Sequence, residues 1–504
     1  MHIMRNKIFL SSLVFFVLTM LSSFALAQTS IEDVVRSGIS VGQTRTLSIE
    51  EASRLALLNN FDIQLARYDA KISKTKKDES KSIYDIILTI GAAYNKDKSA
   101  SSSTLAAGKT INNDYEVGLS KKLPTGTTIS VDQTNNRQWT ESSAVTMNPA
   151  HDSSLGFTVS QDLGKNFFGI QDRGDVKITQ IDIQNLEYIS LDKIEQSLAA
   201  VQVAYWDLAL AIDLVNIEKD MLLQAERLYL INREKLSDGL VEQPDFLASQ
   251  ANYKQRISDV SVSENTVQTR MNALKLGLNL TQDMSDIVPF NHLDLNIQEV
   301  KVEASLINAF DHRRDYKQAL NDVRMRNIAL SMKKNNVWPE INLKASLARN
   351  GLGDKFKDSI NNITEENHPD FSAFLNITIP LENRSAKSQL KKAELQKAQA
   401  LIGLKRMEKT ILIDVVDQVR LCKTLGEKAK HQEEIAGLQA QKLKEQEKIF
   451  SYGRSDVDTI VRYQNDALAA QKQAVHALFD YKVALINLNV KQGVLLQQYW
   501  QEGI

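Results

Sequence analysis

Residues 194–215 read IEQSLAAVQVAYWDLALAIDLV, and the spacing of their apolar side chains decides the fold. These side chains recur at alternating spacings of 4 and 3, which is the heptad period of helices that supercoil around one another. The members of this seam are Ile194, Leu198, Val201, Tyr205, Leu208, Ile212 and Val215. A second apolar stripe runs beside it from Val203 to Leu228, so the helix must contact neighbours on two sides, as in a bundle or a closed ring.

The helical pattern ends at Ser237-Asp-Gly-Leu-Val241, a glycine-centred turn that is followed by Pro244 at the start of the next helix. A second seam with the same spacings then runs from Phe246 to Leu278. We therefore expect two long antiparallel helices, at about 170–238 and 243–280, joined by a tight tip.

The sequence also contains an internal duplication. The segment 51–62, EASRLALLNNFD, resembles a segment that includes residues 306–315, with Asp62 on Asp315 at the offset 315 − 62 = 253. Gly239 of the first tip corresponds to Gly453 at the offset 453 − 239 = 214. A seam follows Gly453 as well, so the second half also predicts a helical hairpin. Its long helices are expected at about 384–452 and 456–498.

This duplication divides the chain into a first structural repeat over 28–280 and a second over 305–504, with a linker at 281–304. Period-two alternation within about 84–163 and about 341–381 predicts half-buried strands in each repeat. The expected fold class is therefore α+β, with long coiled helical hairpins and a strand region.

The strand region of the first repeat is the longer one. It has 73 residues from Ile90 to Leu163 against 38 from Leu343 to Leu381, a surplus of 73 − 38 = 35. The surplus contains two alternating segments within Asp114–Gln133, on either side of a Pro-Thr-Gly turn. This hairpin either joins the sheet, giving six strands per chain instead of four, or folds over the sheet as a cap. Lys121 and Lys122 lie on opposite faces of its first strand, so one of them would face lipid; this counts against the first alternative.

Residues 1–27 have the pattern of a secretory signal. Arg5 and Lys7 precede an apolar core, and Ala25-Leu-Ala27 offers small residues at the cleavage position. A retained membrane anchor is the weaker interpretation because serines interrupt the apolar run. No cysteine follows the cleavage position closely enough to carry a lipid, and the single cysteine, Cys422, is expected to be a small buried residue of a helix.

Charge and hydropathy exclude several classes of protein. Without the signal, 61 − 2 = 59 Lys and Arg residues face 62 Asp and Glu residues, so no bulk basic field favours nucleic acid. Past the signal no uninterrupted apolar run of about 18 residues occurs, and we expect a membrane to be crossed only by strands that close into a barrel.

A search for chemistry finds no catalytic or metal-binding pattern. The seven histidines lack ligand spacing, and no phosphate loop or nucleophile elbow is present, so no enzyme, cofactor or metal is expected. Asp456 and Asp458 are better explained as a helix start than as an acid/base pair. Residues 97–112 and 352–370 are expected to be solvated loops; the second contains acidic residues that could attract cations, namely Asp354, Asp358, Glu365, Glu366 and Asp370.

Three segments together resemble the TolC-like outer membrane efflux protein family, across essentially the whole mature chain. They are LSIEEASRLALLNNFDIQLARYDAKIS (47–73), SDGLVEQPDFLASQANY (237–253) and VWPEINLKASL (337–347). The resemblance implies a homotrimer in which every subunit gives strands to one barrel in the outer membrane, while twelve helices form a periplasmic tunnel. It further implies that the tips meet a periplasmic adaptor (membrane fusion protein) and an inner-membrane transporter, as in a tripartite efflux pump or type I secretion system that conducts small molecules or polypeptides.

The resemblance also implies roles for residues at the tips. Adaptor docking is expected at Gly239, Leu240, Val241, Gly453 and Arg454, although a glycine C-cap with a hydrophobic contact would explain the first tip equally well. Entrance gating is expected at Asp245, Asp456, Asp458, Thr459 and Arg462. Thr459 and Arg462 stand where the family carries an aspartate pair, so a matching acidic ring is not expected; if Arg462 faces the lumen near Asp245, Asp456 or Asp458, a mixed-charge ring would close the entrance.

Two other classes of function compete with a passive channel. A non-channel coiled-coil protein, such as a periplasmic adaptor or cell-surface scaffold, explains the helices but not the strands between them. A secreted enzyme is disfavoured by the absence of a catalytic motif.

Overall fold

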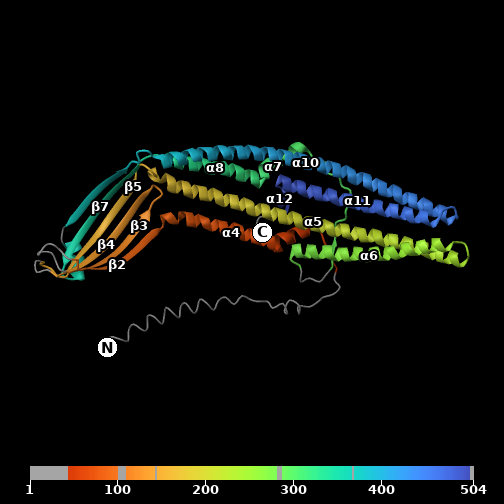
Figure 1. Ribbon diagram of the computed structural model, residues 1–504, viewed down its shortest axis with the longest axis horizontal. Helices are drawn as coiled ribbons and strands as arrows, with labels where there is room; N and C mark the ends of the chain where they lie inside the picture. The colour runs from red at the N-terminus through yellow and green to blue at the C-terminus, as the bar shows by residue number, and fades with distance from the viewer. Residues whose placement is uncertain (1–43, 100–108, 142–144, 281–285, 366–367, 500–504) are drawn as a thin grey trace, which may run out of the picture.

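Two helical hairpins of equal dimensions dominate the computed structural model, which describes residues 44–99, 109–141, 145–280, 286–365 and 368–499 (Figure 1). The first hairpin is α5 (Ile170–Ser237, 68 residues) and α6 (Gln243–Leu278, 36 residues). The second is α10 (Arg384–Ser451, 68 residues) and α11 (Val457–Gln492, 36 residues). At about 1.5 Å per residue, the 68-residue helices are roughly 100 Å long. The expected signal at 1–27 lies outside the described residues.

The heptad seam of α5 forms the core of the helical region. Six of its seven members are buried and Ile212 is partly buried, packed against α3 (Ile49–Asn59), α6 and α11. The Tyr205 hydroxyl, also in this seam, donates to the Leu47 carbonyl at 3.0 Å. Among the described residues one helix, the one that contains α5, is long and apolar enough to cross a membrane, but 61% of the relevant window is buried inside the molecule. Its apolar character is that of a core helix.

Six antiparallel strands form one sheet at the end of the molecule opposite the tips (Figure 1). Their order in the sheet is their order along the chain, β2-β3-β4-β5-β7-β8. The strands are β2 (Ile86–Asp97), β3 (Thr110–Lys122), β4 (Thr127–Thr140), β5 (Ala150–Asp162), β7 (Glu340–Gly353) and β8 (Pro369–Thr378). The surplus hairpin of the first repeat is β3–β4. It is paired with β2 on one side and β5 on the other, so it joins the sheet and is not a cap.

The turn of this hairpin is fixed to the start of α5. Lys122 Nζ lies 2.7 Å from a carboxylate oxygen of Asp172 in the first turn of α5. Gly126, at φ +74°, packs so closely on Gly169 that a Cβ would come within 2.7 Å of its backbone nitrogen. The charge of Lys122 is therefore paired within the protein at the helical end of the sheet. Of the two lysines that counted against a membrane strand, Lys122 no longer does so.

Shorter helices pack alongside the long helices, mainly in the part of the helical region nearer to the sheet (Figure 1). α4 (Phe61–Lys81) packs against α5, while α8 (Arg314–Asn335) packs against both α5 and α10. The Asn60 side chain begins α4 by accepting from the Ile63 backbone at 3.1 Å, a standard N-cap. The remaining elements of this layer are η1 (Ser82–Tyr84), η2 (Phe167–Gly169), α7 (Val302–His312) and α12 (Leu495–Tyr499).

Buried polar contacts join these layers near the middle of the molecule. Arg314 donates to Glu195 Oε2 at 2.6 Å, and Glu195 Oε1 accepts from the Leu496 backbone at 3.0 Å. Cys422 is 1% exposed in a cluster with valines of α10, as the sequence predicted. Burial raises the pKa of its thiol to about 11.

Two expectations about loops were wrong, and the segment expected to link the two repeats contains a strand. The linker at 281–304 contains β6 (Asp286–Pro289), which pairs in parallel with β1 (Thr44–Leu47). The segment 352–370 contains α9 (Phe356–Glu365). Residues 110–112 and Asp97, expected in a loop, extend the β2–β3 ladder. A four-residue strand shows too little alternation to be seen without its partner, which lies more than 230 residues away in the sequence.

α9 covers the end of the sheet farthest from the helices. Its Ser359 hydroxyl lies 2.8 Å from the buried hydroxyl of Ser153 on β5. Gly351 of β7 makes this approach possible because a Cβ there would lie 2.4 Å from the Ser359 carbonyl oxygen. The amphipathic helix was hidden in the sequence because its packing depends on these small residues of distant strands.

Candidate functional site

The sheet has one apolar and one polar face. Side chains alternate along each strand, and the register places apolar members of neighbouring strands opposite one another, as in Leu88–Leu119–Val131 and Phe157–Leu347–Phe371. The apolar face comprises Ile86, Leu88, Ile90, Tyr94, Tyr115, Val117, Leu119, Ile129, Val131, Leu155, Phe157, Val159, Leu343, Leu347, Phe371, Leu375 and Ile377. Most of these side chains are exposed in the chain, including every one on β2 and β8. A contiguous apolar surface of this kind marks a membrane or protein contact.

The opposite face carries mostly hydroxyl, amide and carboxylate groups, with Ile87 and Phe374 as exposed apolar members on the two edge strands. Across the sheet, Ser120, Ser130, Thr158, Ser346 and Ser372 form one row. The next rows contain Asp132 and Glu116, whose side chains extend over glycines of neighbouring strands. A sheet with one water-loving and one apolar face is the pattern of a strand region that separates water from lipid.

The two edge strands are left without an outer partner. Within the part of the chain that the structure describes, β2 and β8 each pair with one strand. Because the sheet has six antiparallel strands, its first and last strands run in opposite directions. The β8 edge of one copy therefore matches the β2 edge of another in an antiparallel ladder.

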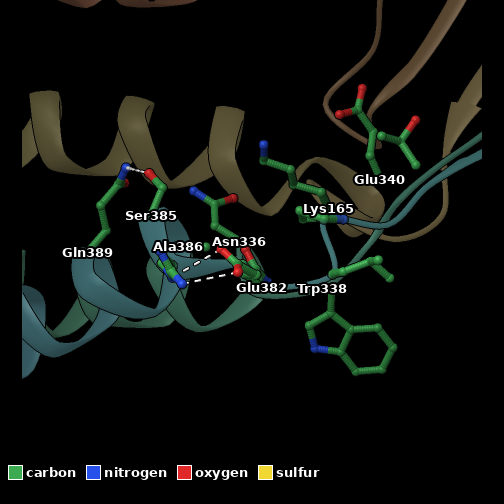
Figure 2. A pocket seen from close by; sticks show the side chains of 13 residues that line it. Lys165, Asn336, Trp338, Glu340, Glu382, Ser385, Ala386 and Gln389 are labelled. Carbon is green, nitrogen blue, oxygen red and sulfur yellow. Dashed lines mark hydrogen bonds and ion pairs between the residues drawn. The ribbon is translucent and has the colours of Figure 1, made fainter.

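Tryptophan residues stand at both ends of the sheet. At the helical end, Trp338 lines a pocket of about 690 Å³ between β7, β8 and the start of α10; its indole ring points away from the polar residues there and is 62% exposed (Figure 2). In the same pocket Arg384 pairs with Glu382 at 3.0 Å. Gln389 donates to Ser385 (Figure 2). At the far end Trp139 lies under the Lys109 ammonium, 4.9 Å from the ring centroid. Tryptophans of this kind favour membrane–water interfaces.

The first tip, residues 238–242, is closed by a Schellman motif. Leu240 N–H donates to the Lys235 carbonyl at 2.8 Å and Gly239 N–H to the Leu236 carbonyl at 3.1 Å, with Gly239 at φ +73°. In such a motif the residue after the glycine usually packs against the preceding helical turn. Here that residue is Leu240, and it is 73% exposed. Val241 is partly exposed beside it. The hydrophobic contact of a simple C-cap is therefore weak here.

The second tip, residues 452–456, repeats this geometry. Arg454 N–H donates to the Ile449 carbonyl at 3.2 Å and Gly453 N–H to the Phe450 carbonyl at 3.0 Å, with Gly453 at φ +72°. Arg454 is exposed. The two hairpins touch just behind the tips, where Leu228 of α5 packs against Val457 and Ile460 of α11.

Of the five residues expected to gate the entrance, Asp456 ends the second tip and the other four lie in the helices just behind the tips. Asp456 is the N-cap of α11 and accepts from the Thr459 backbone at 2.6 Å; this hydrogen bond, aided by the Arg462 charge, holds the pKa of Asp456 below its usual range. Asp458 and Asp245 occupy the first turns of α11 and α6, where carboxylates favour the helix dipole. Arg462 is exposed over the Tyr463 ring and, among the described residues, makes no ion pair. A mixed-charge ring is therefore not closed within one chain.

Both flanks of the helical region expose unpartnered seams. On α4, Phe61, Leu65, Tyr68 and Ile72 recur at spacings of 4, 3 and 4 and are 56–64% exposed; we call them the α4 stripe. On the other flank Leu395 and Ile402 of α10 are exposed. Gly403 of α10 is also open: apart from its own helix backbone, no described atom lies within 4 Å of where its Cβ would be.

Sequence reasoning missed these flank residues although their spacing was visible. The α4 stripe has the same period as the seam of α5, but spacing alone does not tell which seam is satisfied within the chain. The buried Asn232 of α5 was also missed; within the described part of the chain neither its amide nitrogen nor its oxygen has a hydrogen-bond partner. Among the described residues, no group of three or more His, Cys, Asp or Glu side chains is arranged to hold a metal ion.

Comparison with known proteins gives a clear result only at the level of structure. No protein-family model and no curated protein matches the sequence. The CmeC outer membrane channel of Campylobacter jejuni superposes with a TM-score of 0.65 at 14% identity, covering 88% of this chain and 85% of that one. The MtrE outer membrane channel of Neisseria gonorrhoeae in its open state gives 0.64 at 14% identity, with 88% and 89% covered. The outer membrane protein VceC of Vibrio cholerae gives 0.63 at 14% identity, with 88% and 96% covered.

The chain therefore has the fold of TolC-like outer membrane channels along nearly its whole described length. The resemblance that the sequence predicted is confirmed for the fold, including its combination of long helices and an antiparallel sheet.

Proposed function

We propose that three copies of this chain form an outer membrane channel-tunnel that serves a tripartite efflux pump or a type I secretion system. The observation that carries the proposal is the exposed apolar face of the sheet. An apolar surface across six strands is costly in water and favourable in lipid, at about 25 cal/mol for each Å² removed from water. Strands of 10 to 14 residues are long enough to cross the hydrocarbon core when tilted.

A membrane-inserted sheet must close into a barrel because lipid cannot satisfy the backbone groups of a free edge. The single chain supplies two such edges, β2 and β8, in complementary directions. A ring of copies satisfies both. Three copies is the number that the resemblance to TolC-like channels implies.

The flanks of the helical region support the same ring. Along the chain α4 leads into edge strand β2 and α10 follows edge strand β8, and the two helices lie on opposite flanks of the helical region (Figure 1). Closing the barrel would therefore bring the α4 stripe of one copy toward the exposed side of α10 of the next. Gly403 fits this arrangement because an exposed glycine within a helix costs about 1 kcal/mol relative to alanine unless a neighbour needs the space. The exposed seams then become contacts between copies.

The helical hairpins would form the wall of the tunnel. The pairs α5–α6 and α10–α11 have identical lengths, which supports a two-fold structural repeat within the chain. Three copies provide twelve long helices around a common axis. The signal expected at residues 1–27 would direct the chain across the inner membrane, with the helices in the periplasm.

At the tips the chain would meet a periplasmic adaptor and an inner-membrane transporter. Leu240 and Val241 expose apolar surface beyond the first hairpin, and Gly239, Gly453 and Arg454 hold or flank the two turns. Among the described residues Arg462 makes no ion pair, so it could pair with Asp245, Asp456 or Asp458 of a neighbouring copy. Such pairs beside Thr459 would narrow the entrance at rest.

The channel would be passive, since transport through it needs no chemistry from its own residues. A coiled-coil adaptor or cell-surface scaffold would use the hairpins equally well, but it would leave the apolar face of the sheet exposed to water. Extraction supplies the test. The protein should fractionate with the outer membrane and migrate as a heat-modifiable, detergent-dependent species with the mass of three chains. A monomer that stays soluble without detergent would contradict the proposal.

A further inference from the structure

We infer that the β3–β4 hairpin widens the membrane barrel, so that three copies close an eighteen-stranded pore with a polar lumen broad enough for a helix or an unfolded polypeptide. This inference rests on the proposed assembly of three copies. It concerns the size of what passes, which that assembly alone leaves undetermined.

The hairpin is a full member of the sheet on both sides. All twelve residues of β2, from Ile86 to Asp97, pair with β3, and twelve residues of β4 pair with β5. The apolar face continues through it without a break, from Leu88 across Leu119 and Val131 to Phe157. Removing the hairpin from the ladder would therefore expose two further edges and interrupt the surface that lipid is proposed to cover.

The turn of the hairpin is tied to the helical end of the sheet and not to its far end. Besides the ion pair between Lys122 and Asp172, Gln161 of β5 donates to the Thr125 carbonyl at 3.1 Å. A lid over the outer mouth would need its turn at the opposite end. The position of the turn thus agrees with strands that cross the whole barrel wall.

The register also gives the tilt of the strands. The apolar residues of β2 are centred on Ile90. The residues paired across the sheet from Ile90 lead to Pro369 on β8. The apolar residues of β8, however, run from Phe371 to Ile377 and are centred on position 374. The lipid band is displaced by 374 − 369 = 5 residues over five strand-to-strand steps, or about one residue per strand. With about 3.3 Å along a strand and about 4.8 Å between strands, a level band requires a tilt of about 35°. This value lies in the range of closed transmembrane barrels.

Strand number and tilt together set the size of the barrel. At a tilt of about 35°, eighteen strands give a backbone radius of about 17 Å, whereas twelve strands give about 11 Å. Subtracting about 5 Å for inward side chains leaves a lumen about 24 Å across in the first case and about 12 Å in the second. The wider lumen admits a helix, which is about 10–12 Å across with its side chains, and excludes a folded domain of 100 residues, whose radius of gyration is about 13 Å.

The lining favours water and polar cargo. The inward face would carry the hydroxyl row of Ser120, Ser130 and Thr158, followed by rows that hold Glu116 and Asp132. No described Lys or Arg side chain of β3 or β4 points inward in the rows of these two carboxylates. The eighteen-stranded barrel is therefore a hydrated pore and not a packed core.

Two cysteine variants in the hairpin distinguish a wall strand from a lid. Glu116→Cys and Val117→Cys are neighbours on β3 that face opposite sides of the sheet. Native Cys422 contributes little background because it is buried and its pKa is raised to about 11. With trimers in lipid vesicles and a charged, membrane-impermeant maleimide, we expect Glu116→Cys to label at least tenfold faster than Val117→Cys. Equal labelling of both would mean that the hairpin lies in water, which overturns the inference.

Electron cryo-microscopy of the native assembly counts the strands directly, and a deletion variant provides the control. Replacing residues 98–149 by Asn-Gly would join β2 directly to β5 in an antiparallel hairpin and should reduce the backbone diameter from about 34 to about 22 Å. A native trimer with twelve wall strands would refute the wider pore and leave the proposed function standing. Absence of a trimeric barrel in the native protein would instead refute the proposed function itself.

Discussion

Replacing Phe157 by arginine should prevent assembly in the outer membrane. Phe157 lies near the middle of the apolar face of β5, between Val131 and Leu347 on the neighbouring strands, and is 46% exposed in the single chain. If this face contacts lipid, the guanidinium of Phe157→Arg would lie near the centre of the bilayer. The next residue, Thr158, faces the other side of the sheet and provides a matched control.

The expected effect follows from the depth of the position. An arginine on the lipid face of a transmembrane barrel costs about 2–4 kcal/mol near the midplane, or about 6–12 kcal/mol for three copies. Even the lower figure reduces the population of inserted trimers by roughly 10⁴. Thr158→Arg removes one hydroxyl contact with Ser346, at 3.0 Å, which is worth about 0.5–1.5 kcal/mol per copy.

The assay is the yield of heat-modifiable trimer in outer-membrane fractions, with the total amount of chain measured in parallel. We expect no trimer from Phe157→Arg and at least half of the native yield from Thr158→Arg. Equal yields from both variants would refute the assignment of the two faces. Loss of trimer from Thr158→Arg alone would mean that the faces are reversed.

The remaining predictions concern the tips and the flank. Changing Leu240 and Val241 to aspartate should abolish export without reducing trimer yield; normal export would refute docking at this tip. Arg462→Ala should raise single-channel conductance if Arg462 holds the entrance closed, and an unchanged value would place closure elsewhere. Gly403→Ala should lower the thermal midpoint of the trimer because a partner helix needs the space, whereas a lone exposed helix would be stabilised by up to about 1 kcal/mol. The pKa of Asp456 is lower in the folded protein than in the unfolded chain. Its carboxylate therefore stabilises the fold at pH values above the usual pKa of aspartate, and this stabilisation is lost as the pH falls through the folded-state pKa. The thermal midpoints of the native protein and of Asp456→Ala should therefore converge as the pH is lowered.

The helices could be predicted from the sequence because their period is local. Spacings of 4 and 3 lead directly to α5 and its seam, and a glycine that ends a seam leads to the tips at Gly239 and Gly453, both observed at positive φ. The strands were predictable as a region for the same reason. The sequence did not show whether the β3–β4 hairpin would join the sheet, because pairing with β2 and β5 is a non-local contact.

The missed features depend on partners that are distant in the sequence or absent from the chain. β6 is recognisable only beside β1, and α9 only where Gly351 leaves room for it. The α4 stripe was visible as a period, yet its exposure becomes clear only when the packing of the whole chain is known. The surroundings of Arg462 depend on neighbouring copies, so neither the sequence nor one chain determines its partner.

Single-channel recording tests the central claim most directly. The claim is that copies of this chain alone form a continuous aqueous path across a membrane. Purified trimers added to a planar lipid bilayer should produce discrete, reproducible current steps, and a preparation of Phe157→Arg treated in the same way should produce none. The account would be contradicted if trimers of the native protein and of Arg462→Ala both associated with the bilayer and left its conductance at the baseline.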